Sequence, residues 1–207
     1  MKIDTFNVGP LATNCYLVTC ETTNESVLID PGGTSKQLLE SIKGTRLKTV
    51  LLTHGHFDHI AGINTILDVA DVPVLIHRED TDMLIDPRCN GSSMIGQTIT
   101  AVEASGVLAD GDTVRFGESS LDVIHTPGHT RGGISFVSEG SFVIAGDTLF
   151  KMSVGRWDLP GGDYGILMNT LHNIFSKMPD DTIVYPGHGN RTSIGSEKTY
   201  NQFMVGS

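Results

Sequence analysis

The sequence predicts a layered α/β fold in which two β-sheets pack together and helices cover their outer faces. Short apolar runs that stop at turn residues recur along the chain, and helical patterns fall between some of them in both halves. The 207 residues suit a single domain, 1–207, which can bury a sizeable core without disulfides. The runs are rich in Val, Ile and Leu, which is typical of strands that are buried on both faces.

We expect ten strands, each a β-favouring run that ends at Gly, Pro, Asn, Asp or Ser, or close to one. They span residues 3–8, 14–19, 26–29, 48–52, 73–76, 113–116, 121–124, 133–137, 142–145 and 182–185.

Helical periodicity predicts helices over residues 35–42, 60–69 and 164–175, and a short helix after Ser193. The first begins with Ser35, a residue type that caps helices, after Pro31-Gly32-Gly33. Residues 86–105 are small and polar without a regular pattern, which predicts a surface loop or a mobile flap over a site.

Composition restricts the partners. The chain has 14 Lys and Arg and 24 Asp and Glu, which gives a formal charge of −10. This charge argues against nucleic acid or an anionic membrane as the main partner. The three cysteines, Cys15, Cys20 and Cys89, show no metal-type spacing, and Cys15 is expected to be a core thiol. The start resembles no signal peptide and no apolar run is long enough to span a bilayer, so we expect a cytoplasmic protein.

Four ligand-type residues follow one apolar strand, in Leu51-Leu52-Thr53-His54-Gly55-His56-Phe57-Asp58-His59. Residues two apart in an extended segment point the same way, so His54 and His56 can face one ion. Asp58 and His59 fall where the next helix begins and can face a second ion. A polar loop that merely holds histidines explains this density poorly.

Three later strand ends repeat the design, each with Gly beside a ligand-type residue. They carry His129 in Thr126-Pro127-Gly128-His129-Thr130, Asp147 in Gly146-Asp147-Thr148, and His188 in Pro186-Gly187-His188-Gly189. Taken singly, each could be a turn residue or a helix cap. Together with the first cluster they predict a metal site held on loops by a rigid scaffold.

The count predicts two divalent metal ions per chain. One site comprises His54, His56 and His129 with a position left for water; the other comprises Asp58, His59 and His188; Asp147 can bridge both. Nitrogen and carboxylate ligands without thiolate favour zinc, with iron, manganese or cobalt as alternatives. A water shared by two such ions is ionised near neutral pH and can act as a nucleophile. For His77 and His125 we expect a supporting or core role, and His172 lies within a predicted helix.

His54-Gly55-His56-Phe57-Asp58-His59 resembles the His-x-His-x-Asp-His signature of the metallo-β-lactamase superfamily, and the later motifs resemble its remaining ligand motifs in order. The resemblance runs from about Asn14 to Gly189. It implies an αββα sandwich with the metals at one edge between the sheets.

Within the superfamily the chain looks most like glyoxalase II and its short relatives, on Asn14-Cys15-Tyr16-Leu17-Val18, Asp30-Pro31-Gly32-Gly33 and Gly146-Asp147-Thr148-Leu149-Phe150. Many true β-lactamases carry Cys where Asp147 stands, and the diiron flavoproteins usually carry Glu where His56 stands, so both branches are disfavoured. Full-length glyoxalase II continues into a C-terminal helical region that supplies basic residues for glutathione. Arg191 and Lys198 are the only basic residues after His188 here, so we do not expect a glutathione site of that kind.

The resemblance implies a metallohydrolase that acts on a small acyl thioester, with Asp58 as a ligand that also orients the nucleophile. Gly155-Arg156-Trp157-Asp158 resembles a Gly-Arg-x-Asp element of the short relatives and of persulfide dioxygenases. Arg156 either binds a substrate carboxylate or carbonyl or forms a loop salt bridge with Asp158.

Two alternatives remain open at this point. A persulfide dioxygenase would use one iron on His54, His129 and Asp147. A non-enzymatic metal-binding protein would not need an open coordination position.

Overall fold

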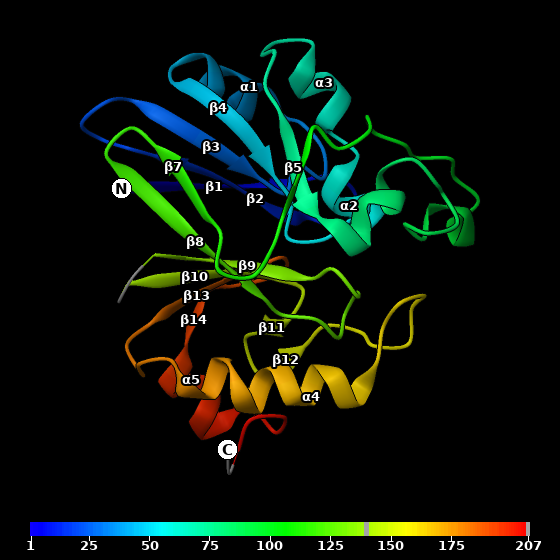
Figure 1. Ribbon diagram of the computed structural model, residues 1–207, viewed down its shortest axis with the longest axis vertical. Coiled ribbons are helices and arrows are strands. Elements are labelled where there is room, and N and C mark those ends of the chain that lie inside the picture. The colour runs from blue at the N-terminus through cyan, green and yellow to red at the C-terminus, as the bar shows by residue number, and fades with distance from the viewer. Residues whose placement is uncertain (139–140, 206–207) are drawn as a thin grey trace.

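The computed structural model describes residues 1–138 and 141–205, and its layers run helix–sheet–sheet–helix (Figure 1). The first sheet has the order β1-β2-β3-β4-β5-β6, formed by Lys2–Val8, Thr13–Thr19, Glu25–Ile29, Arg46–Leu51, Val74–His77 and Gly106–Leu108. The second has the order β14-β13-β10-β9-β8-β7, formed by Thr192–Ser193, Ile183–Pro186, Phe142–Gly146, Ile134–Ser138, Ser119–His125 and Thr113–Phe116. A small hairpin pairs β11 (Leu149–Phe150) with β12 (Ser153–Val154). The predicted αββα architecture is confirmed.

Helices pack on the outer faces of both sheets (Figure 1). The first sheet carries α1 (Lys36–Lys43), α2 (Phe57–Ile60) and α3 (Ile63–Leu67), and the second carries α4 (Tyr164–Asn173) and α5 (Ile194–Tyr200). Short 3-10 helices are η1 (Arg78–Leu84), η2 (Ser92–Ile95) and η3 (Phe175–Lys177). As predicted, Ser35 caps α1, and its side chain accepts a hydrogen bond from Leu38 N at 3.1 Å.

Three apolar cores hold the layers together. Between the sheets, Tyr16, Ile29 and Leu51 of the first sheet pack in one cluster with Val123 and Phe136 of the second. The other two cores lie between each sheet and its own helices. Each sheet is therefore buried on both faces, as the Val- and Ile-rich runs indicate.

All ten predicted strands are present within a few residues, while four short strands, β6, β11, β12 and β14, were not predicted. The predicted helix over residues 60–69 is wrong, because α2 ends at Ile60 and α3 begins at Ile63. Gly62 N donates to Pro31 O at 2.8 Å, outside the helix, so the chain turns there. The predicted helix over residues 164–175 ends at Asn173, and η3 follows it.

Strand direction brings the predicted ligands to one place. In the second sheet β9 is antiparallel to both β8 and β10, and β10 is parallel to β13. The carboxyl ends of β8, β10 and β13 therefore share one edge, and His129, Asp147 and His188 follow these ends. This arrangement explains how residues spread over the chain can build one site.

Residues 86–105 form the expected loop, but one that the fold anchors. It contains η2, and Ile99 and Ala101 pack against the first core cluster. The buried Asn90 donates to Met83 O and Ile99 O, both at 2.9 Å, and accepts from Ser92 N at 3.0 Å. The mobility of this segment stays a prediction.

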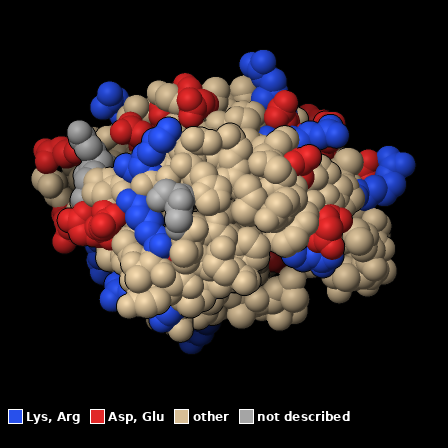
Figure 2. Space-filling view, turned by 90° about the horizontal axis from the view of Figure 1, so that it is seen from below, with Lys and Arg blue, Asp and Glu red and all other residues tan. Residues whose placement is uncertain are grey.

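Acidic and basic side chains are interspersed around the edge of the face shown in Figure 2, and the described residues over most of its centre carry neither charge. That face lacks, in its described part, the single-signed basic field that binding to nucleic acid uses. No helix among the described residues is long and apolar enough to cross a membrane. The absence of nucleic-acid and membrane partners stays a prediction.

Asn90→Ala should destabilise the protein, because it removes three hydrogen bonds and leaves buried backbone groups unpaired. We expect a loss of roughly 2–4 kcal/mol in the free energy of unfolding, measured by urea denaturation. Asn64→Ala is the matched control, because Asn64 makes one exposed bond to Thr100 O at 3.2 Å. Equal losses in the two variants would show that Asn90 does not anchor the segment.

Candidate metal centre

The structure brings all seven predicted ligand residues together at the shared edge. Their ligand-type atoms form three overlapping groups, each with its atoms within 4.8 Å of one another. These groups are His54 with His56 and His129, His54 with His59 and Asp147, and Asp58 with His59 and His188.

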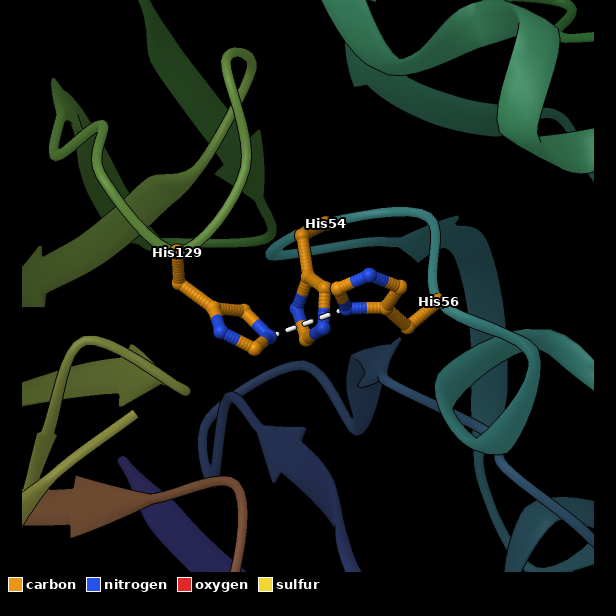
Figure 3. Close-up of side chains that lie close together, drawn as sticks. All are labelled: His54, His56 and His129. Carbon is orange, nitrogen blue, oxygen red and sulfur yellow. Dashed lines mark hydrogen bonds between the residues drawn. The ribbon is translucent and has the colours of Figure 1, made fainter. Parts of the chain in front are cut away.

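Three imidazoles of the first group face one another (Figure 3). His56 Nδ1 lies 2.9 Å from His129 Nε2, and the His54 ring centroid lies 4.9 and 4.7 Å from those of His56 and His129. Burial, reinforced by neighbouring histidines, lowers the pKa of His54 well below its usual value and that of His56 to about 3. His54 Nε2 has no hydrogen-bond partner in the described part of the chain. Neutral, buried ring nitrogens that converge in this way fit a divalent cation.

The second group combines a carboxylate with two imidazoles. Asp58 Oδ2 lies 3.1 Å from His188 Nε2 and 3.7 Å from His59 Nε2. Burial alone would raise the pKa of Asp58, but His59 and His188 outweigh burial and lower it, so Asp58 is ionised. As predicted, Asp58 and His59 lie on α2, directly after the strand-end loop.

Asp147 lies between the two groups. Its Oδ1 is 3.4 Å from His59 Nε2, and its Oδ2 is 3.6 Å from His129 Nε2 and 3.5 Å from His188 Nε2. Burial works against ionisation of Asp147, but the imidazoles around it lower its pKa overall. One carboxylate thus faces both groups, as a bridging ligand must.

Four of the imidazoles also contact an oxygen outside the cluster, and for His54 it is Thr53 Oγ1, 3.1 Å from Nδ1. His129 Nδ1 donates to Arg156 O at 2.6 Å, and His188 Nδ1 donates to Leu11 O at 3.2 Å. His59 Nδ1 lies 3.0 Å from Asp30 Oδ2. Such outer partners fix the tautomer and orient the opposite nitrogen, Nε2, toward the cluster, which is the usual arrangement of metal-binding histidines.

Two buried carboxylates that the sequence analysis did not identify as site residues support the ligand loops. Asp30 accepts from Thr53 N at 2.8 Å and Thr53 Oγ1 at 2.6 Å, directly before His54. Asp80 accepts from Thr130 Oγ1 and Gly132 N, both at 2.7 Å, and from Gly55 N at 3.3 Å. Asp80 therefore ties the His54–His56 loop to the His129 loop. Asp30 follows a strand and could have been noticed, whereas Asp80 sits among other acidic residues and gives no distinguishing signal.

The first sheet fixes the His188 loop. Asn14 Nδ2 donates to Pro186 O and to Gly189 O, both at 2.9 Å, and Tyr16 OH donates to Pro186 O. A Cβ on Gly187 would lie 2.0 Å from Asp147 Oδ1, so only glycine lets the loop pass this close to the ligands. The Asn14-Cys15-Tyr16 motif therefore has a physical role, which is to join the two sheets at the site.

The remaining histidines lie outside the cluster. His77 and His125 stack with ring centroids 4.4 Å apart and planes 11° from parallel. Together with Glu79 they form a further ligand-type group, but nearly parallel rings cannot direct their in-plane lone pairs at one ion. His125 Nε2 donates to Arg131 O at 2.9 Å, which supports the loop after His129. His172 lies on α4, as expected.

Arg156 takes part in the site through its backbone. A Cβ on Gly155 would lie 1.7 Å from Asp147 O, so glycine is required before the carbonyl that binds His129. The Arg156 guanidinium pairs with Asp158 through contacts of 2.9 and 3.0 Å, and both side chains are exposed. The expected loop salt bridge therefore exists, while Arg156 also lines the cavity beside the cluster.

That cavity has a volume of about 400 Å³ and opens onto His56, Asp58, His129, Asp147 and His188. Met94 and Ile95 of η2 also line this cavity, so the 86–105 segment borders the site.

Comparison with known proteins identifies the family of this fold and site. The model of the metallo-beta-lactamase superfamily matches residues 8–188. A probable metallo-hydrolase of Bacillus subtilis, YqgX, is 34% identical over 100% of this chain and 99% of its own. Hydroxyacylglutathione hydrolase GloC of Haemophilus influenzae is 30% identical over 99% and 98%.

Two solved structures share the whole fold. The BLEG-1 B3 metallo-beta-lactamase superposes with a TM-score of 0.93 at 36% identity, covering 99% of this chain and 100% of that one. TTHA1623 in a di-iron-bound form gives 0.84 at 36% identity, covering 97% and 99%.

Asp147→Ala should lower the metal content of both groups, because its carboxylate faces each of them. Elemental analysis of protein purified without chelator should show close to two ions per chain for the wild type and well under one for the variant. His172→Ala should match the wild type. Equal metal contents in all three proteins would contradict the bridging role of Asp147.

Proposed function

The chain belongs to the metallo-β-lactamase superfamily, and from this premise we propose that it is a glyoxalase II-like metallohydrolase that cleaves a small acyl thioester. The main evidence for a thioester substrate is the set of acidic and basic groups that line the cavity. Outside the seven clustered residues, the described part of the wall contributes one ionisable side chain, Arg156, and no Lys, Tyr, Cys or Glu. Arginine does not give up its proton in proteins, so it cannot act as a general acid.

The leaving group decides between substrates for such a site. An amine leaves an acyl centre only when a general acid protonates it. A thiol has a pKa near 8.5 and departs as a thiolate without that help. A cavity without a dedicated acid therefore favours thioesters over amides and lactams.

We propose that the cluster holds two divalent ions, zinc foremost, with His54, His56 and His129 on one, Asp58, His59 and His188 on the other, and Asp147 on both. Such ions would polarise the substrate carbonyl and lower the pKa of water. The carboxylates support this proposal, because Asp30 and Asp58 are buried, the Asp147 side chain is only 11% exposed, and together they require nearby positive charge. The di-iron form of TTHA1623 makes iron the main alternative metal.

The residues of the chain then have distinct tasks. Asp58, ionised and held by Thr13 Oγ1 at 3.3 Å, is a ligand whose second role is to orient the attacking water. Asp30 and the Arg156 carbonyl keep the Nε2 atoms of His59 and His129 directed into the cluster. The Arg156 guanidinium, at the cavity wall, would exchange its contact with Asp158 for a carboxylate or carbonyl of the substrate.

A second candidate function follows if iron is the bound metal. A persulfide dioxygenase would need one iron on His54, His129 and Asp147, and these residues also converge here. The second group would have no task in that reaction, but unused ligand-type residues can remain in such enzymes, so the bound metal and the assays decide between the two functions.

Zinc-loaded protein should release thiol from a simple thioester under anaerobic conditions. Parallel assays with the iron-loaded form should measure thiol release and oxygen uptake, with thioester, persulfide and lactam substrates. Oxygen consumption with persulfide by the iron form, with no thioester cleavage by either form, would replace the hydrolase by the dioxygenase. Lactam hydrolysis faster than thioester hydrolysis would refute the argument from the leaving group.

Arg156→Ala should lower kcat/KM for a carboxylate-bearing thioester about tenfold, because one charged hydrogen bond to substrate is lost. Metal content should not change, since His129 binds the backbone of Arg156. Arg88→Ala is the matched control: Arg88 pairs with Asp86, also two residues away, at 2.7 Å, but does not line the cavity. Unchanged kinetics in Arg156→Ala would show that the Arg156 side chain only forms the loop salt bridge with Asp158 and does not bind substrate.

A further inference from the structure

We infer that the preferred substrate carries an aliphatic acyl group and an uncharged thiol part, in contrast to a hydroxyacyl thioester of glutathione. This inference rests on the proposed thioesterase function and concerns the same cavity. It follows from what the wall offers to the parts of a substrate that extend beyond the reacting carbonyl.

Most of the wall beyond the metal cluster is apolar. The apolar side chains come from four separate parts of the chain and are those of Leu11, Phe57, Met94, Ile95, Phe150, Val154 and Leu159. Met94 and Ile95 are 64% and 54% exposed, and Leu11 is 52% exposed. Covering apolar surface with an apolar ligand lowers the free energy of the complex, so this wall favours binding of an aliphatic group.

The polar side chains of the wall are already engaged. Outside the cluster, the described lining residues include two with polar side chains, Asn90 and Arg156. Both donor hydrogens of Asn90 go to Met83 O and Ile99 O, and its oxygen accepts from Ser92 N. The Arg156 guanidinium is paired with Asp158.

We therefore expect a thiol carrier with several charges to bind weakly in this cavity. Glutathione brings two carboxylates and an ammonium group, and each would lose water without gaining a free partner on this wall. Arg156 could accept one carboxylate at most, and only by giving up Asp158.

The apolar wall is also joined to the reacting centre. Leu11 contributes its side chain to the cavity while its carbonyl accepts from His188 Nδ1. Val154 lies two residues before the carbonyl that accepts from His129 Nδ1. The acyl chain and the reacting carbonyl would thus be positioned by the same segments, which favours turnover of aliphatic substrates as well as their binding.

The test compares thioesters of one small uncharged thiol, N-acetylcysteamine, with acetyl, butyryl and hexanoyl groups, and adds S-lactoylglutathione. On the metal-loaded protein, kcat/KM should rise about threefold for each added methylene, hence roughly 80-fold from acetyl to hexanoyl. S-lactoylglutathione should be poorer than the hexanoyl substrate. A flat or falling series, or preference for S-lactoylglutathione, would overturn this inference and leave the thioesterase intact. Failure to cleave any of the four would overturn both.

A pair of variants ties the gradient to this wall. Ile95→Glu places a carboxylate in the cavity and should flatten the dependence on chain length. Val69→Glu, with Val69 41% exposed and outside the cavity lining, adds the same charge and should keep the dependence. A steep gradient in Ile95→Glu, or equal flattening in both variants, would show that the wall around Ile95 does not select the acyl chain.

Discussion

The structure depends on one electrostatic constraint: largely buried carboxylates and imidazoles converge where water solvates them poorly. Asp58 and Asp147 face His59 at 3.7 and 3.4 Å, with Asp30 on its other side at 3.0 Å. Burial alone would lower the pKa of His59, but these carboxylates raise it well above its usual value. The cluster thus calls for positive charge, and divalent cations satisfy its nitrogen and oxygen atoms together better than protons do.

The rest of the fold can be understood as the means of holding that cluster in place. Three strands of the second sheet end at the same edge and deliver His129, Asp147 and His188, while β4 of the first sheet delivers the remaining ligands. Asn14 and Tyr16 join the sheets through Pro186 O, and Asp80 joins two ligand loops. Ligands held by such cross-links are positioned before any metal arrives, which reduces the ordering cost of binding.

The cluster could be predicted well because several of its ligands lie close together in the sequence. His54, His56, Asp58 and His59 follow one strand, and strand periodicity plus a helix start define their directions. The long apolar strands were predictable for the same reason, whereas β14, with two residues, forms only through pairing with β13. Asp80 and Asn90 were missed because their roles arise from burial and from contacts with distant backbone. The break between α2 and α3 was missed because it depends on Pro31 O, thirty-one residues before Gly62.

The position of Asp147 is the central claim, since one carboxylate must serve two ions for the hydrolase to be binuclear. Anomalous diffraction from crystals of the zinc-loaded protein, recorded above and below the zinc edge, measures this directly. We expect two peaks, one inside the His54, His56 and His129 group and one inside the Asp58, His59 and His188 group, with the Asp147 carboxylate in contact with both. A single peak, or peaks only at sites away from Asp147, would contradict this claim.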